Sequence, residues 1–189
     1  MKATVTSLQQ RRELSEVESS ELLEMQRSIM EKVALGHDPQ LTLDALCQSV
    51  EAMVDNAVAS VMKFDESHSF LEVIAAPSLP DEAKTSLNGL IPDKHAGSCG
   101  TAVYCNEPQY VYNTKTDPRW QHFQQFIIDF NVGACWSVPI RTSDDAAIGS
   151  FALSSFEQRQ PSSFFKSLLE TASHIAGIIL KRQEEEQTL

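Results

Sequence analysis

The sequence lacks the segments that place a protein in a membrane or on the secretory route. No apolar run approaches the roughly 20 residues that cross a bilayer, and the opening stretch MKATVTSLQQRRELSEVESS has no apolar signal-peptide core. Basic residues are also few: 15 Lys and Arg stand against 26 Asp and Glu, for a formal net charge of −11. Such a balance disfavours broad contact with nucleic acid or an anionic membrane. We therefore expect a cytoplasmic protein with neither partner.

Cysteine is scarce too, and its four positions lack the paired short spacings of structural zinc sites. Without an export signal, the thiols are expected to stay free in a reducing compartment. We predict no metal site and no required cofactor. Apolar residues, in contrast, make up a normal 42% of the 189 residues. This share is enough to fill the core of a single domain, and the chain length fits one domain that carries helical extensions.

Helical patterns occupy both ends of the chain. Apolar residues recur every three to five positions over 14–35, which predicts an amphipathic helix with a narrow stripe. GHDPQ breaks this helix, and residues 43–54 then follow the i, i+3, i+4, i+7 pattern of a helix facing the core. A third helix is predicted from Ser162 or Ser163 to the acidic end of the chain.

Strand-like segments fill the middle. Residues 57–64 and 69–76 flank a polar turn, 110–114 alternate, and 133–140 and 147–156 form a second hairpin. A polar connector and a helix over about 117–130, capped by Asp117, separate them. This order predicts an α+β fold: a central antiparallel sheet of about five to six strands, with terminal helices on one face. Crossover helices and a pocket are expected on the other face.

The stretch HAGSCGTAVYCN, residues 95–106, allows two interpretations. Cys99 near a helix start is acidified by the helix dipole, with His95 as a base. Alternatively, Cys99, Ala102 and Val103 share one face and pack against the sheet, which we favour because free cysteine is usually buried.

The same region predicts a ligand pocket. Backbone N–H groups near Ser98, Cys99 and Gly100 are free to meet an anionic or carbonyl group, and aromatic residues after 117 form a lid. Strand 134–140 supplies the floor, through either Cys135 and Ser137 or Trp136 on the opposite side, and alternation leaves both choices open. The candidate ligand-binding residues are Ser98, Cys99, Gly100, Trp120, Phe123, Cys135, Trp136 and Ser137. The alternative is a dry core in which the aromatic residues meet no ligand.

The motifs GSCGTAVY, TKTDPRW and GACWSVPI, in this order, resemble those of bacterial signalling GAF domains. The resemblance implies a GAF domain over 38–182, an N-terminal helix over 1–36 for dimerisation and signalling, and the start of a linker at 183–189. It further implies a small-molecule ligand, a homodimer through the terminal helices and a C-terminal output domain, in many such proteins a diguanylate cyclase.

We therefore predict a sensory GAF domain of a bacterial signal-transduction protein that catalyses nothing itself. One alternative is a thiol enzyme similar to free methionine-(R)-sulfoxide reductases, which also carry G-x-C-G and a later Ala-Cys. Cys99 and Cys135 are the matching positions, but the further cysteine of that pattern is missing from 84–98. The other alternative is a ligand-free dimerisation module.

Overall fold

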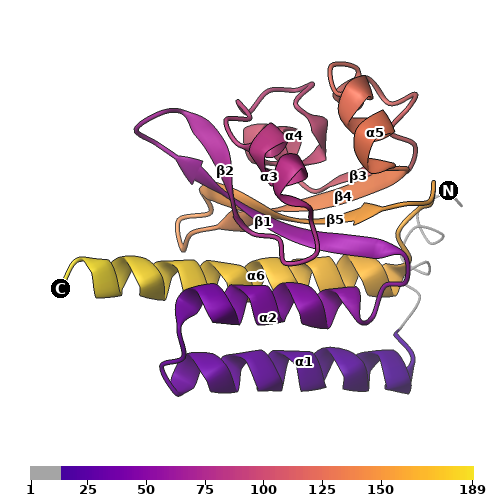
Figure 1. Ribbon diagram of the computed structural model, residues 1–189. Helices are drawn as coiled ribbons and strands as arrows, with labels where there is room; N and C mark the ends of the chain where they lie inside the picture. The colour runs from indigo at the N-terminus through magenta and orange to yellow at the C-terminus, as the bar shows by residue number, and fades with distance from the viewer. Residues whose placement is uncertain (1–13) are drawn as a thin grey trace, which may run out of the picture.

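The computed structural model describes residues 14–189, so residues 1–13 of the expected N-terminal helical segment lie outside the described part. A sheet lies between two layers of helices (Figure 1). The helices are α1 (Glu16–Ala34), α2 (Pro39–Glu51), α3 (Asp81–Leu87), α4 (Gly97–Cys105), α5 (Gln124–Phe130) and α6 (Ser163–Gln187), with a 3-10 turn η1 (Pro118–Trp120). The strands are β1 (Ala57–Asp65), β2 (Phe70–Ala75), β3 (Gln109–Val111), β4 (Ala134–Arg141) and β5 (Ala147–Ser155).

The five strands form one antiparallel sheet in the order β2-β1-β5-β4-β3. Helices α2 and α6 lie against one face of it with α1 beneath them, and α3, α4 and α5 lie over the other face (Figure 1). The predicted α+β fold, with terminal helices on one face and crossover helices on the other, is confirmed.

The terminal helices begin where their side chains cap the first turn. Ser15 and Glu18 form a capping box at α1, in which the Ser15 hydroxyl accepts from the Glu18 N–H at 3.1 Å. Asp38 caps α2 with Pro39 in its first turn, and Ser162 caps α6 by accepting from the Phe165 N–H. These helices enclose the larger core together with alternate residues of the strands.

Strands β1 and β5 approach closely at a glycine. A Cβ atom on Gly149 would lie 2.2 Å from the carbonyl oxygen of Met62, so only glycine fits this place in the ladder. The two hairpins predicted from the sequence are both present, β1–β2 and β4–β5.

The crossover segments differ from the sequence prediction in detail. The helix expected over 117–130 is divided into η1 and α5, because the Phe123 N–H bonds to the Trp120 carbonyl and turns the chain between them. Asp117 does cap η1, as expected, by accepting from the Arg119 N–H at 3.0 Å. The polar connector contains the short helix α3, and β3 ends at Val111, before the expected limit.

Candidate functional site

Helix α4 lies close to the sheet because its inward side chains are small. Gly97 opens the helix with a φ of +66°, and Ser98, Gly100, Thr101 and Ala102 are buried. A Cβ on Gly100 would come within 2.4 Å of the Ala96 side chain. Helix α4 therefore packs directly on β4 and β5, beneath the crossover segments.

The side chain of Ser98 joins three segments of the chain. Its hydroxyl donates to the Cys135 carbonyl in β4 at 2.9 Å and accepts from the Trp120 indole N–H in η1 at 3.0 Å. All three residues are buried, at 1%, 3% and 5% exposure. Because these polar groups have no access to water, Ser98 fixes α4 and η1 in position on the sheet.

Strand β4 divides its side chains between the two faces of the sheet, which answers the question that alternation left open. Cys135 packs under α4 in a small second core with Trp120 and Ile127. Trp136 points to the opposite face, where it stacks on Phe165 of α6 at 5.7 Å between ring centroids. Of the predicted floor residues, the α4 side therefore holds Cys135 and Ser137, and Trp136 lies in the larger core.

Cys99 of α4 packs against the second core, which contains Cys135 of β4. The pKa of Cys99 is lowered chiefly by a hydrogen bond from the neighbouring Cys135 thiol, and burial opposes this effect. The pKa of Cys135 is raised by the same bond, in which it is the donor, and by burial. The packing that the sequence favoured for Cys99 is present, since α4 lies on β4 and β5 and Cys99 contacts the second core.

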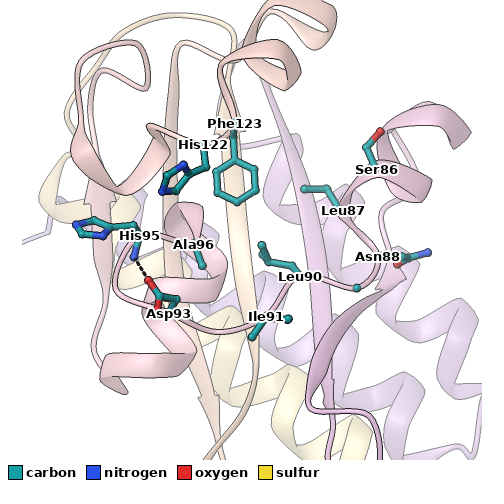
Figure 2. A pocket seen from close by; sticks show the side chains of 11 residues that line it. Ser86, Leu87, Asn88, Leu90, Ile91, Asp93, His95, Ala96, His122 and Phe123 are labelled. Carbon is teal, nitrogen blue, oxygen red and sulfur yellow. Dashed lines mark hydrogen bonds between the residues drawn. The ribbon is translucent and has the colours of Figure 1, made fainter.

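A pocket of about 520 Å³ opens beside this cluster. It is lined by residues 86–91, Asp93, His95, Ala96, His122 and Phe123. Figure 2 shows the Phe123 ring between the two histidines on one side and Leu87 on the other. The Asp93 carboxylate accepts from the His95 backbone N–H at 2.9 Å, which holds the loop before α4 in a turn. The pocket thus combines apolar walls with imidazole groups at one side.

Of the eight residues predicted from the sequence, Phe123 lines this pocket, and it also packs on the second core behind it. Ser98, Cys99, Trp120 and Cys135 are brought together in or against that second core, whose packing is tight. Sequence reasoning missed the wall formed by residues 86–91, which it treated as a polar connector. The available signal was the apolar pair Leu90-Ile91 between Gly89, with a φ of +90°, and a proline.

Residues 36–181 match the family described as the GAF domain. The chain belongs to the GAF domain family. Among curated proteins, this GAF domain is 26% identical over 172 residues to the methyl sulfide methyltransferase-associated sensor of Methanosarcina acetivorans. The match covers 91% of the chain but spans only 17% of the length of that relative.

Solved structures share the fold of this GAF domain. The GAF domain of an Acinetobacter phosphoenolpyruvate-protein phosphotransferase superposes with a TM-score of 0.70 at 16% identity, covering 93% of this chain and 100% of the other. A type II free methionine-R-sulfoxide reductase from Thermoplasma acidophilum superposes with a TM-score of 0.60 at 17% identity, covering 77% and 96%. At these identities the likeness concerns the fold alone.

Two further observations concern the described residues of the GAF domain. Within residues 14–189, no helix has the length and apolar character to cross a bilayer. The same part of the chain contains no group of three or more His, Cys, Asp or Glu side chains arranged to hold a metal ion.

Proposed function

We propose that this GAF domain is a sensory module that binds a small molecule in the pocket between the α3–α4 connector and the η1–α5 turn. The observation that carries the proposal is the pocket itself. Its walls come from two segments about 30 residues apart that meet only over this face of the sheet, so a ligand between them alters how they pack. The description of the Methanosarcina relative as a sensor supports the same role.

A continuous series of contacts supports a route from the pocket to the terminal helices. Phe123 in the pocket wall meets Trp120 edge to face at 6.0 Å, and the indole N–H of Trp120 bonds to Ser98. Ser98 bonds in turn to the Cys135 carbonyl of β4. The next side chain of that strand, Trp136, stacks on α6 from the other face. In the proposal, a ligand that moves Phe123 shifts β4 and, through it, α6.

Ligand binding is tested by a thermal-shift screen of nucleotides, amino acids and metabolites. A ligand at 100 times its Kd stabilises the folded state by about 2.7 kcal/mol. For a domain of this size, that corresponds to a rise in Tm of about 5–11 °C. Substitution Leu87→Trp fills the pocket and should abolish the rise. The control is Leu41→Trp, on an exposed site of α2, which should keep it. A broad screen without any shift would favour the dry-core alternative.

We propose in addition that the terminal helices pair with those of a second copy. Helix α1 packs on α2 and α6 with one face and exposes apolar side chains on another, including Val17 at 68% and Leu23 at 66%. Sedimentation should show a dimer that Leu23→Asp dissociates. Ile128→Asp, equally exposed but on α5 in the other layer, should leave it intact. A wild-type monomer at high concentration would refute this part of the proposal.

The bacterial origin, the cytoplasmic location and the output domain belong to the same proposal. The resemblance to signalling GAF domains favours a diguanylate cyclase that follows α6 and receives the helix movement. The expected observation is an open reading frame that continues past Leu189 into such a domain. A stop codon directly after residue 189 would contradict it.

A further inference from the structure

The pocket wall formed by residues 86–91 is attached to the edge of the sheet. The strand order makes β2 an edge strand. Its outer side is bonded to this wall, because the Leu71 N–H donates to the Leu90 carbonyl at 2.8 Å and the Leu71 carbonyl accepts from the Gly89 N–H at 2.9 Å. A movement of the wall therefore acts on β2 through backbone hydrogen bonds.

The side chain of Asn88 adds a third bond to the same edge. Its Oδ1 accepts from the Val73 N–H at 2.8 Å. Asn88 thus supplies the acceptor that a neighbouring strand supplies in the interior of the sheet. Asn88 also lines the pocket, and Figure 2 shows it with Leu90 on the side away from the two histidines. One residue therefore connects the pocket directly to β2.

The residue after Val73 is bonded from the other layer of the molecule. The register of β2 against β1 shifts at this point, and Ile74 is the extra residue of a β-bulge. The Ile74 carbonyl accepts from the side-chain amide of Gln40, in the first turn of α2, at 2.7 Å. Asn88 and Gln40 therefore hold adjacent residues of one strand, Asn88 from the pocket layer and Gln40 from the layer of terminal helices.

We propose that Asn88 is a positioning residue of the ligand pocket and that the bulge at Ile74 couples the pocket wall to α2. This role rests on the proposed function, since it concerns the same pocket. A ligand that displaces the wall pulls on the Val73 N–H through Asn88, and the bulge then shifts the Ile74 carbonyl that Gln40 holds. The movement reaches α2 as a change at its first turn.

The surroundings of the bulge suit it to this role. A bulge interrupts the hydrogen-bond ladder, so fewer ladder bonds resist a movement of β2 at this point. The loop after β2 is bonded to α2 as well, because the Ser78 hydroxyl donates to the Glu51 carboxylate at 2.7 Å. The opposite pocket wall, at Phe123, connects to β4, which lies on the other side of the sheet centre from β2. A ligand between the walls thus acts on α2 through β2 and on α6 through β4.

Hydrogen exchange of single amides, followed by NMR on the chain without a ligand, tests the link. Asn88→Ala removes the acceptor of the Val73 N–H, whose exchange should become about 3–10-fold faster. Exchange at residues 42–44, in the first turns of α2, should become at least about twofold faster. Asn88→Asp keeps an acceptor oxygen and should restore both rates. Thr85→Ala, which removes a side-chain bond within α3, is the matched control and should change neither.

Gln40→Ala separates this link from other routes to α2. In that background, Asn88→Ala should still speed exchange at Val73 but should leave residues 42–44 unchanged. The coupling is overturned if Asn88→Ala alone leaves α2 unchanged, or if the change in α2 persists without the Gln40 side chain. An equal change in α6 also overturns it, because this would be a general loss of stability. Asn88→Asp behaving like Asn88→Ala would overturn the positioning role.

Filling the pocket tests whether the link responds to occupancy. Leu87→Trp should change exchange at residues 42–44 by at least about twofold when Gln40 is present, and should not in the Gln40→Ala background. No change in either background overturns the response. The exchange experiments need no ligand, so their outcome differs from that of the ligand screen. A screen without a hit argues against the sensory function, whereas the exchange rates alone decide the link from Asn88 to Gln40.

Discussion

Substitution of Ser98 by alanine is the sharpest test of how α4 and η1 are held on the sheet. The Ser98 hydroxyl is 1% exposed and makes two hydrogen bonds, to the Cys135 carbonyl at 2.9 Å and from the Trp120 indole at 3.0 Å. Alanine removes one oxygen atom but leaves two buried polar groups, the Trp120 indole N–H and the Cys135 carbonyl, without this partner and without access to water. The expected loss is therefore larger than that of one ordinary hydrogen bond.

The size of the stability loss follows from the hydrogen bond that each of these two groups loses. A buried donor left without an acceptor costs about 1–3 kcal/mol, and the Trp120 N–H falls in this class. The Cys135 carbonyl loses one of two acceptor positions, which adds about 1 kcal/mol. We expect the free energy of unfolding to fall by about 2–4 kcal/mol, equivalent to a fall in Tm of about 4–16 °C for a domain of this size.

Urea unfolding of a double-mutant cycle measures the effect. Trp120→Phe removes the indole N–H, so Ser98→Ala in that background should cost at least about 1 kcal/mol less than in the wild type. Ser143→Ala, in the exposed β4–β5 turn, is the control and should change the free energy by less than about 0.5 kcal/mol. Equal costs in the two backgrounds would refute the reasoning, as would a Ser98→Ala variant as stable as the control.

Three further predictions concern stability and activity. Gly149→Ala should lower the free energy of unfolding by about 2–3 kcal/mol or more, measured in urea, because its Cβ would lie 2.2 Å from the Met62 carbonyl oxygen. Arg119 lowers the pKa of Asp117, so the stability from this pair is complete above about pH 4 and is lost as pH falls through the lowered pKa. Asp117→Asn should therefore make the free energy of unfolding less dependent on pH below about pH 4. An unchanged pH dependence in this range would contradict the prediction. Methionine sulfoxide reduction with a thiol reductant should be undetectable and unaffected by Cys135→Ser. Measurable turnover would contradict the expectation that the domain catalyses nothing itself.

Local signals explain why most of the fold was predictable. Ser15, Asp38 and Ser162 cap helices through bonds to the residue three positions away, so the sequence shows where these helices begin. The two hairpins depend on short polar turns between alternating strands. The division of 117–130 into η1 and α5 was not predictable, because an apolar pattern of helical spacing also fits two short turns whose aromatic residues converge on one cluster.

The candidate site was predicted less completely. The sequence singled out Ser98, Cys135 and Trp120, which the structure joins by hydrogen bonds, but these residues form a packed cluster beside the pocket. The pocket wall at Leu87 and Leu90 depends on how the α3–α4 connector folds over the sheet. No periodicity marks such a wall, since its residues come from the end of the short helix α3 and from the turn that follows it.

The motifs of the sequence by themselves indicated the family. The sequence also predicted the order of the strands and of every helix except α3, and the layer of the terminal helices, because capping, turns and apolar periodicity act within a few residues. Only the tertiary structure decided which face of β4 meets α4, and that Ser98 joins α4 to β4 and to Trp120 by hydrogen bonds. The physical reason is register. Strand alternation gives two equivalent faces, and only the pairing of β4 with β5 and the close packing of the small residues of α4 choose between them.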